Sequence, residues 1–428
     1  MVTLEERSFN SLFDNRKIAN CDFLLSCLKK IKNKYNKKYT LLAICPNSES
    51  VIKTSIISAK KNDAPLIFAA TLNQIDTDYG YTNMNFSEFL DKVNFEVKDI
   101  DFEGPMIIGI DHGGPWLKDR QVIEDWDLQR SMDGIKRSFE QAVLAGYNLI
   151  HVDPTIDKSL HPGEIIDIKV VVDRTVELIC HIEKFRRDKN LPKVSYEVGT
   201  EEVHGGLADI YTFKKFLKLL RKKLELNSLL DVWPCFVVGK VGTDLHTTYF
   251  DSSVAKKLVK EAGKYGSFIK GHYTDYVENP SDYPKSGMGG ANIGPELTEV
   301  EFNALIKLSK VEEELIKSRK INCASNIEKT LEKAVYDSGR WKKWLNEKEK
   351  NLNFYQLSPE RRSWLIKTGA RYIWTNPQVL DARKLLEKNL LAGNMNSEEL
   401  IKENIIKRLD KYFNAFNLVG LNTKIFKS

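Results

Sequence analysis

Residues 106–115 read Met-Ile-Ile-Gly-Ile-Asp-His-Gly-Gly-Pro. The first five positions carry no charge, and an apolar run of this length is typical of a strand buried on both faces. Asp111 and His112 follow at once, and the next Gly-Gly-Pro ends the strand. This stretch therefore predicts a buried strand whose carboxyl end carries polar side chains.

Similar apolar runs recur between residues 40 and 320, separated by amphipathic helical patterns. The predicted strands are 41–45, 66–70, 106–110, 149–152, 194–198, 235–238, 268–271 and, more weakly, 291–293; the helices include 51–61, 132–145, 165–186, 213–224 and 254–263. Buried strands alternating with helices predict an α/β fold with a parallel sheet. The number of units favours a closed (β/α)8 TIM barrel over an open doubly wound sheet. No G-x-G-x-x-G follows the first strand to indicate a dinucleotide fold.

The rest of the chain has a different pattern. Residues 1–39 are basic and helical in character, and residues 321–428 contain helical patterns alone, at 327–336, 359–372, 377–388 and 398–413. We therefore expect an N-terminal helical segment (1–39), the barrel (40–320) and a C-terminal helical subdomain packed on it (321–428).

Composition excludes several classes of protein. The 428 residues are 42% hydrophobic and 29% charged with a net charge of +6, which is typical of a globular protein. The lysine-rich stretch 214–223 reads as the solvated face of a helix, so no nucleic-acid partner is expected. No apolar run is long enough to span a membrane. The polar N-terminus and six cysteines without a C-x-x-C motif favour a cytoplasmic protein with reduced thiols.

The histidines are concentrated where a barrel carries its active site. Six of the seven fall on or shortly after the third to seventh predicted strands, and the carboxyl ends of barrel strands converge on one face. We expect His112, His246 and His272 to be metal ligands, because three imidazoles and a carboxylate suit Zn²⁺, Mn²⁺, Co²⁺ or Ni²⁺. His204 is left open. A structural role is expected for the other three, His151, His161 and His181.

Glycines form a second group, in the run Ser-Gly-Met-Gly-Gly-Ala-Asn-Ile-Gly at 286–294. Backbone N–H groups at Gly287, Gly289 and Gly290 can bind a phosphate, as loops late in a TIM barrel often do. A glycine loop without a ligand fits the pattern equally well. The other expected substrate-binding residues are the polar side chains Asn73, Gln74, Lys240 and Asn292.

Several segments together resemble the class II tagatose-bisphosphate aldolase accessory-subunit family. They are Ala-Thr-Leu-Asn-Gln-Ile-Asp at 70–76, Gly-Tyr-Thr-Asn-Met at 80–84, Gly-Ile-Asp-His-Gly-Gly-Pro at 109–115, Gly-Thr-Glu at 199–201, Gly-His-Tyr-Thr-Asp-Tyr at 271–276, Gly-Pro-Glu-Leu-Thr at 294–298, Arg-Tyr-Ile-Trp at 371–374 and Pro377. Their order and spacing agree from about residue 66 to residue 390. The resemblance implies a barrel related to class II ketose-bisphosphate aldolases, with Asp111 transferring a proton and His112 and His272 binding metal.

The chain also departs from the accessory-subunit pattern. It has Gly113 where Leu is usual, Trp116 where Asn is common, and His246 where accessory subunits lack a histidine. It also carries Glu197 on the fifth predicted strand. The extra histidine and glutamate favour a complete metal site.

Two hypotheses follow. In the first, a metal held by His112, His246, His272 and a glutamate (Glu201, or else Glu197) binds a ketose or ketose phosphate, and the C3–C4 bond breaks. Re-addition of the aldehyde gives 4-epimerisation, which we favour, and its loss gives aldol cleavage. Some members of the family resemble ketose and ketose-phosphate 4-epimerases. In the second hypothesis the chain is a non-catalytic partner of a separate aldolase. Homo-oligomerisation is left open.

The proton-transferring residue raises a geometric question. Successive side chains of a strand point to opposite sides, so Asp111 and His112 do not both face the cavity if the strand stays regular. Gly113 and Gly114 permit the backbone to leave strand geometry. The alternative is that Asp111 only caps the loop, in which case Glu202 or Asp275 is the next candidate for proton transfer.

Overall fold

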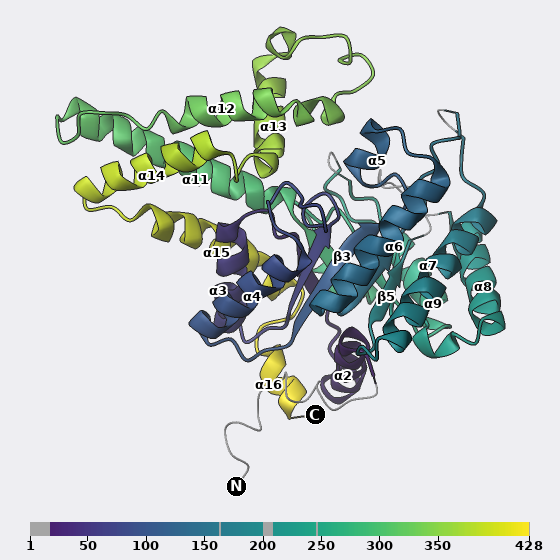
Figure 1. The fold of residues 1–428 in the computed structure, drawn as a ribbon. Helices are drawn as coiled ribbons and strands as arrows, with labels where there is room; N and C mark the ends of the chain where they lie inside the picture. The colour runs from purple at the N-terminus through teal and green to yellow at the C-terminus, as the bar shows by residue number, and fades with distance from the viewer. Residues whose placement is uncertain (1–17, 162–163, 200–208, 245–246, 428) are drawn as a thin grey trace.

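The computed structural model describes residues 18–161, 164–199, 209–244 and 247–427. Eight parallel strands form a closed barrel in sequence order, which confirms the predicted (β/α)8 fold (Figure 1). They are β1 (Leu41–Ile44), β2 (Leu66–Thr71), β3 (Met106–Gly113), β4 (Leu149–Val152), β5 (Ser195–Val198), β6 (Phe236–Val238), β7 (Phe268–Gly271) and β8 (Gly290–Ile293). Most of their residues are buried, because side chains fill the barrel on one side of each strand and helices cover the other.

Helices surround this barrel. They are α3 (Glu49–Lys61), α4 (Phe86–Ile100), α5 (Asp119–Ile123), α6 (Leu128–Ala145), α7 (Ile168–Asp188), α8 (Ile210–Leu226), α9 (Ser252–Gly263), α10 (Asp282–Ser286) and α11 (Pro295–Lys317), with the 3-10 turn η2 (Leu230–Val232). Asp and Asn side chains cap several of them; Asn85, for example, forms a full capping box with Glu88 at the start of α4.

The helix α2 (Asn20–Tyr35) covers the amino ends of the strands. Its apolar face is buried, the Asp22 carboxylate accepts a hydrogen bond from Ser195 at the start of β5 (2.5 Å), and Lys29 donates to the carbonyl of Gly266 just before β7 (3.1 Å). With this end closed, the carboxyl ends of the strands are left as the open mouth of the barrel.

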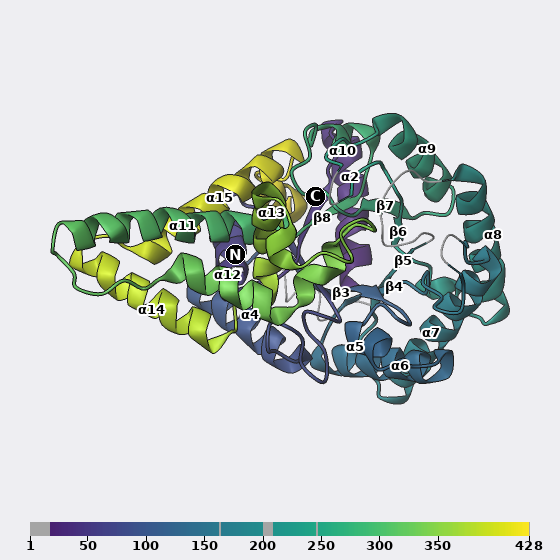
Figure 2. The same cartoon turned by 90° about the horizontal axis from the view of Figure 1, so that it is seen from above.

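After α11 the described residues contain helices and turns alone, as predicted. They are α12 (Ile327–Ser338), α13 (Pro359–Gly369), α14 (Pro377–Ala392), α15 (Ser397–Ala415) and α16 (Leu421–Phe426), with the 3-10 turns η3 (Arg340–Trp344), η4 (Phe354–Gln356) and η5 (Ala370–Tyr372). Together with α11, the helices α12, α14 and α15 form an arm that projects from one side of the barrel (Figures 1 and 2). The helix α15 packs on both α11 and α3, so the arm is anchored to the barrel wall. The exact domain limits stay a prediction.

No helix within the described ranges is both long enough and apolar enough to cross a membrane.

Candidate metal centre

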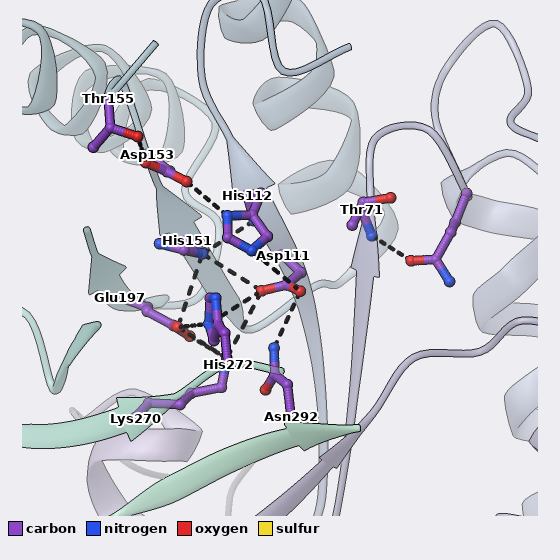
Figure 3. A network of polar contacts seen from close by, with 11 residues as sticks. Thr71, Asp111, His112, His151, Asp153, Thr155, Glu197, Lys270, His272 and Asn292 are labelled. Carbon is purple, nitrogen blue, oxygen red and sulfur yellow. Dashed lines mark hydrogen bonds and ion pairs between the residues drawn. The ribbon is translucent and has the colours of Figure 1, made fainter. Parts of the chain in front are cut away.

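Polar side chains at the carboxyl ends of five strands gather in one cluster inside the barrel (Figure 3). Its members are Asp111 and His112 of β3, His151 of β4, Glu197 of β5, Lys270 of β7, His272 directly after β7, and Asn292 of β8. All but His112, which is slightly more exposed, are buried.

Strand alternation explains why most of these side chains face inward. Residues two apart share one side of a strand, so Lys270 and His272 point the same way, as do His151 and Asp153. His151 also lies directly beside Glu197 in the register of β4 and β5. The barrel interior therefore receives the side chains of neighbouring strands at one level.

Asp111 and His112 both reach the cluster because β3 is irregular at this point. The register with β4 shifts between Ile110 and Gly113, and His112 has a left-handed backbone with φ 51°. The His112 Nε2 atom thus comes to 4.0 Å from the Asp111 Oδ2 atom. The backbone leaves strand geometry as expected, but at His112 itself rather than at the glycines.

Gly113 and Gly114 have a different role from the predicted one. A Cβ atom at Gly113 would overlap the Phe139 ring, and one at Gly114 would overlap the carbonyl of Asp153. The two glycines therefore allow close packing of β3 against α6 and the end of β4.

His112 is oriented through its other ring nitrogen. Its Nδ1 atom lies 2.6 Å from the Asp153 Oδ2 atom, and the Asp153 carboxylate also accepts a hydrogen bond from Thr155 (2.6 Å). A carboxylate that holds one nitrogen of a histidine, with the other nitrogen turned to a polar site, is typical of metal-binding histidines. The His112 Nε2 atom is the one left to act as a ligand.

The pKa values of His112 and His272 are shifted in opposite directions. Burial disfavours a charged His112, but the carboxylates of Asp111 and Asp153 outweigh this and raise its pKa to about 9. Burial lowers the pKa of His272 to about 4, and the charge on His112 contributes to this. His272 is therefore neutral at physiological pH, which is the form that binds a metal, whereas His112 is protonated and would release its Nε2 proton when a metal binds.

A buried ion pair lies beside these histidines. The Lys270 Nζ atom is 2.9 and 2.6 Å from the two oxygens of Glu197, and the two residues are 1% and 0% exposed. Although burial disfavours ionisation, Lys270 and His151 lower the pKa of Glu197 to about 2. The Glu197 Oε1 atom also lies 3.0 Å from the His272 Nε2 atom.

The donor atoms of the cluster fit a divalent metal. Two overlapping groups have potential ligand atoms within 4.8 Å of one another: His112, His151 and His272, and Asp111, His151, Glu197 and His272. The Asp111 Oδ1 and His151 Nε2 atoms are buried without a hydrogen-bond partner among the described residues. Imidazole and carboxylate ligands in this combination suit a first-row metal.

Comparison with known proteins places this chain in a family. The family model for D-tagatose-1,6-bisphosphate aldolase subunit GatZ/KbaZ-like proteins matches residues 28–415. The chain belongs to this family. The resemblance seen in the sequence is thereby confirmed over nearly the whole chain.

Solved structures agree on the fold. A probable tagatose 6 phosphate kinase from Sinorhizobium meliloti is 20% identical, with a TM-score of 0.69, covering 88% of this chain and 100% of that one. A fructose-bisphosphate aldolase from Campylobacter jejuni is 12% identical, with a TM-score of 0.52, covering 94% of this chain and 96% of that one. At these identities the likeness concerns the barrel fold.

In this GatZ/KbaZ-like chain the predicted ligands are only partly brought together. His112, His272 and Glu197 lie in the cluster, whereas His246, Glu201 and Glu202 lie outside the described residues. His151 was expected to be structural, but its ring centroid is 5.0 Å from that of His112 and 5.3 Å from that of His272.

Sequence reasoning also gave no role to two further members of the site, Asp153 and Lys270. The signal that could have found them is strand alternation: Asp153 shares the inward side of β4 with His151, and Lys270 shares that of β7 with His272.

Four members of the cluster line the floor of a cavity of about 840 Å³, a volume suited to a small-molecule ligand; they are Asp111, His112, His272 and Asn292. His151, Glu197 and Lys270 are not among the lining residues. Asn73, Gln74 and Asn292 line it, as expected for substrate-binding residues. Asn73 also bonds the backbone of Leu117 and Asp119, while Gln74 bonds Thr71 and Asn47. Asn292 donates to the Asp111 Oδ2 atom (3.1 Å). Substrate contact by these side chains stays a proposal.

The prediction of a phosphate loop at Gly287, Gly289 and Gly290 is wrong, because these residues lie at the other end of the barrel from the cavity. Gly287, Gly289 and Gly290 immediately precede β8 or begin it, so they lie at the amino ends of the strands, opposite the cavity. A Cβ atom at Gly289 would overlap Phe268, and one at Gly290 would lie 3.3 Å from Lys270 Cγ. Gly289 and Gly290 serve strand packing, and Gly287 ends α10 (Asp282–Ser286) with a left-handed backbone, φ 87°. Lys240, half-buried just after β6, is not among the described residues that line the cavity.

Asp275, the other expected proton-transfer candidate, lines the cavity, and its side chain contacts the start of α11. Its Oδ1 atom accepts hydrogen bonds from the backbone N–H groups of Gly294 (2.9 Å) and Glu296 (2.8 Å). Burial, followed by the charge of Glu296, raises its pKa to about 7. Asp275 therefore fixes the first turn of α11 in addition to facing the cavity.

We expect Asp275→Asn to stabilise the protein at high pH. Because the folded-state pKa is raised from 3.8 to about 7, the wild-type carboxyl costs folding free energy as pH rises through this window. Asparagine keeps the acceptor oxygen and cannot ionise. The free energy of unfolding of the variant relative to wild type should grow between pH 4 and pH 7, by up to about 4 kcal/mol, and then level off. Urea unfolding at a series of pH values measures this; a constant difference would contradict the raised pKa.

Proposed function

We propose that this chain is a divalent-metal-dependent ketose or ketose-phosphate 4-epimerase that acts by retro-aldol and aldol chemistry at C3–C4. The observation that carries the proposal is the meeting of an ionised aspartate, Asp111, with the rings of His112, His151 and His272. Of these, Asp111, His112 and His272 line a sugar-sized cavity, and His151 lies buried beside them. Zinc is the first candidate metal, with manganese, cobalt and nickel as alternatives.

When bound, such a metal would polarise the ketose carbonyl and favour negative charge on the adjacent oxygen. The histidines would hold it, with His112 fixed in orientation by Asp153. Glu197 is a further carboxylate within reach. Its ion pair with Lys270 would have to loosen if Glu197 were a ligand.

Asp111 is in the ionised form that can accept the proton of the C4 hydroxyl. Burial favours its protonated form, but the charges of His112 and His272 outweigh this and hold the pKa of Asp111 well below its usual range. Asn292 occupies the Oδ2 atom, while the Oδ1 atom has no hydrogen-bond partner among the described residues. The Oδ1 atom is buried 3.5 Å from His151 Nδ1, 3.6 Å from His272 Nε2 and 3.9 Å from Lys270 Nζ, and it is the oxygen that we assign to the substrate proton.

The proposed reaction is balanced without a further reagent. Asp111 accepts the C4 hydroxyl proton, the C4–O bond becomes a carbonyl, and the C3–C4 electron pair moves into the enediolate of the other fragment. The aldehyde turns over, the C3–C4 bond re-forms on its opposite face, and Asp111 returns the proton. Epimerisation rather than cleavage requires that both fragments stay in the cavity, and the wall formed by η3 and η5 above the barrel mouth supports this.

A second candidate function is a non-catalytic subunit of a separate aldolase; the family description names an aldolase subunit. One observation favours it. Lys270 neutralises Glu197, so the charge of this buried glutamate is balanced without a metal. In that case a catalytic aldolase chain is the partner, and the histidines are remnants.

Metal content and turnover separate the two functions. We expect the purified protein to hold a stoichiometric, chelator-removable transition metal, measured by mass spectrometry, and to interconvert fructose and tagatose 6-phosphates, their bisphosphates or the free ketoses. His112→Ala and His151→Ala should lose metal and activity together, by at least about 100-fold in turnover. His181→Gln is the matched control, because His181 pairs with Glu140 on the outer helices. A metal-free wild type that turns over no ketose with any first-row metal supports the partner role.

A further inference from the structure

The wall of the cavity that faces the metal cluster comes from the C-terminal extension. The turns η3 and η5 contribute Arg340, Lys342, Lys343, Trp344, Arg371 and Tyr372 to the lining, whereas the barrel contributes the acidic and histidine floor. These turns lie between α12 and α14, on the side where the arm meets the barrel mouth (Figure 2). Four cations line this wall, and the carboxylates that line the same cavity are those of Asp119, at the start of α5, Asp111 and Asp275.

Two of these cations are already neutralised. Arg340 Nη2 lies 2.7 Å from Asp119 Oδ2, and Lys343 Nζ lies 2.9 Å from Asp119 Oδ1. One carboxylate thus serves two cations, and the wall keeps a net positive charge.

Arg371 is different because its charge is buried and, among the described residues, no carboxylate lies within ion-pair distance of it; the charge of Asp275 acts on it only from further away. The residue is 8% exposed, and its Nε atom has no hydrogen-bond partner in the part of the chain that the structure describes. Its guanidinium carbon lies 4.7 Å from the ring centre of Trp344 and 5.0 Å from that of Tyr372. The two aromatic rings hold the guanidinium in place but do not neutralise it.

A buried cation without a counter-ion is costly, and a bound anion removes that cost. Arginine is the side chain best suited to phosphate and carboxylate groups, because its planar fork donates two parallel hydrogen bonds. We propose that Arg371, together with the exposed Lys342, forms the subsite for the anionic end of the substrate, which is therefore a sugar phosphate or a sugar acid. This inference deepens the proposed function and rests on it for the identity of the ligand as a sugar.

The position of Arg371 relative to the metal cluster suits one small ligand. Asp111, His112 and His272 of the floor line the same cavity as Arg371 of the wall. A small ligand that fills this cavity can therefore contact both the floor and the wall.

The test is calorimetric titration of the full-length protein with inorganic phosphate and, separately, with acetate. We expect the wild type to bind one of the two anions, and Arg371→Met to weaken that binding by at least about tenfold. Arg371→Lys, which keeps the charge but loses the fork, should show a smaller loss. Tighter binding of phosphate indicates a phosphate ester as the natural ligand, and tighter binding of acetate indicates a sugar acid.

Two controls make the result specific. Arg130→Met removes an arginine that stacks on Trp126 at 4.2 Å on the exposed side of α6, and it should leave anion binding unchanged. His112→Ala should also retain anion binding, which separates the subsite from the metal and from the proposed epimerisation. Thermal unfolding checks that each variant is folded; if Arg371→Met is not, Arg371→Lys alone decides. Unchanged affinity in the Arg371 variants, or no anion binding by wild type at millimolar concentrations, overturns the proposal.

Discussion

Asp111→Asn keeps its metal and loses turnover by about 10²–10⁴-fold, the usual contribution of a positioned general base. The reason is that asparagine has nearly the same shape as aspartate but accepts no proton as a base. The acceptor for Asn292 at the Oδ2 position (3.1 Å) remains available. The three rings of His112, His151 and His272 form a ligand group that does not include Asp111, so metal content should be unchanged.

Steady-state kinetics and metal analysis on the same preparation measure this result. A loss of more than about tenfold, or about 1.4 kcal/mol of barrier, with full metal content supports Asp111 as the proton-transferring residue. Near-normal turnover would instead give Asp111 a structural role. Asp275, or Glu202 outside the described residues, would then be the next candidate.

The second large effect concerns stability. We expect Lys270→Met to lower the free energy of unfolding by about 3–5 kcal/mol, because removing one partner of a buried ion pair leaves the other charge uncompensated. Glu197 is 0% exposed, and Lys270 contacts both of its oxygens. Lys270 also lies 3.9 Å from the Asp111 Oδ1 atom, so two carboxylates lose the same cation.

A divalent metal should reverse part of this loss, because it brings positive charge back to the cluster. Urea unfolding of wild type and Lys270→Met, each with and without added zinc, measures both effects. Lys333→Met is the matched control: its partner is Asp337 on the exposed face of α12, and such pairs contribute about 0–1 kcal/mol. A Lys270→Met variant as stable as wild type would mean that Glu197 is not held as a buried anion.

The fold could be predicted from the sequence because its signals are local. Each strand is a short apolar run, and each is followed by a helix whose pattern is visible within one window. All eight predicted strands are present, including the weak one near Ala291. The aspartate and histidine at the end of β3 were found for the same reason, since they directly follow an apolar run.

The remainder of the site depends on contacts between distant residues. Lys270 and Glu197 are 73 positions apart, and only closure of the barrel brings them together. A lysine within a strand gives no sign by itself that a carboxylate two strands away neutralises it. Arg371 follows the barrel in the sequence, and no hydrophobic periodicity indicates that its turn lies at the barrel mouth.

The error over the glycine run has a similar cause. Gly287, Gly289 and Gly290 fit a loop at either end of a strand, and their amino-acid type does not say which end. The weak strand prediction at 291–293 placed them before the strand. Given that, the parallel topology alone would have assigned them to the closed end of the barrel.

The left-handed backbone conformation of His112 has a cost in folding free energy. For a residue with a Cβ atom this conformation costs about 1–2 kcal/mol relative to the right-handed region. Glycine at this position would remove the cost and, with it, a metal ligand. Glycine would also leave the buried Asp153 carboxylate without the ring that lies 2.6 Å from it, and the loss of a buried pair costs about 3–5 kcal/mol. The contact with Asp153 therefore outweighs the backbone strain, and the same contact that orients the ring for its site also keeps a strained residue at position 112.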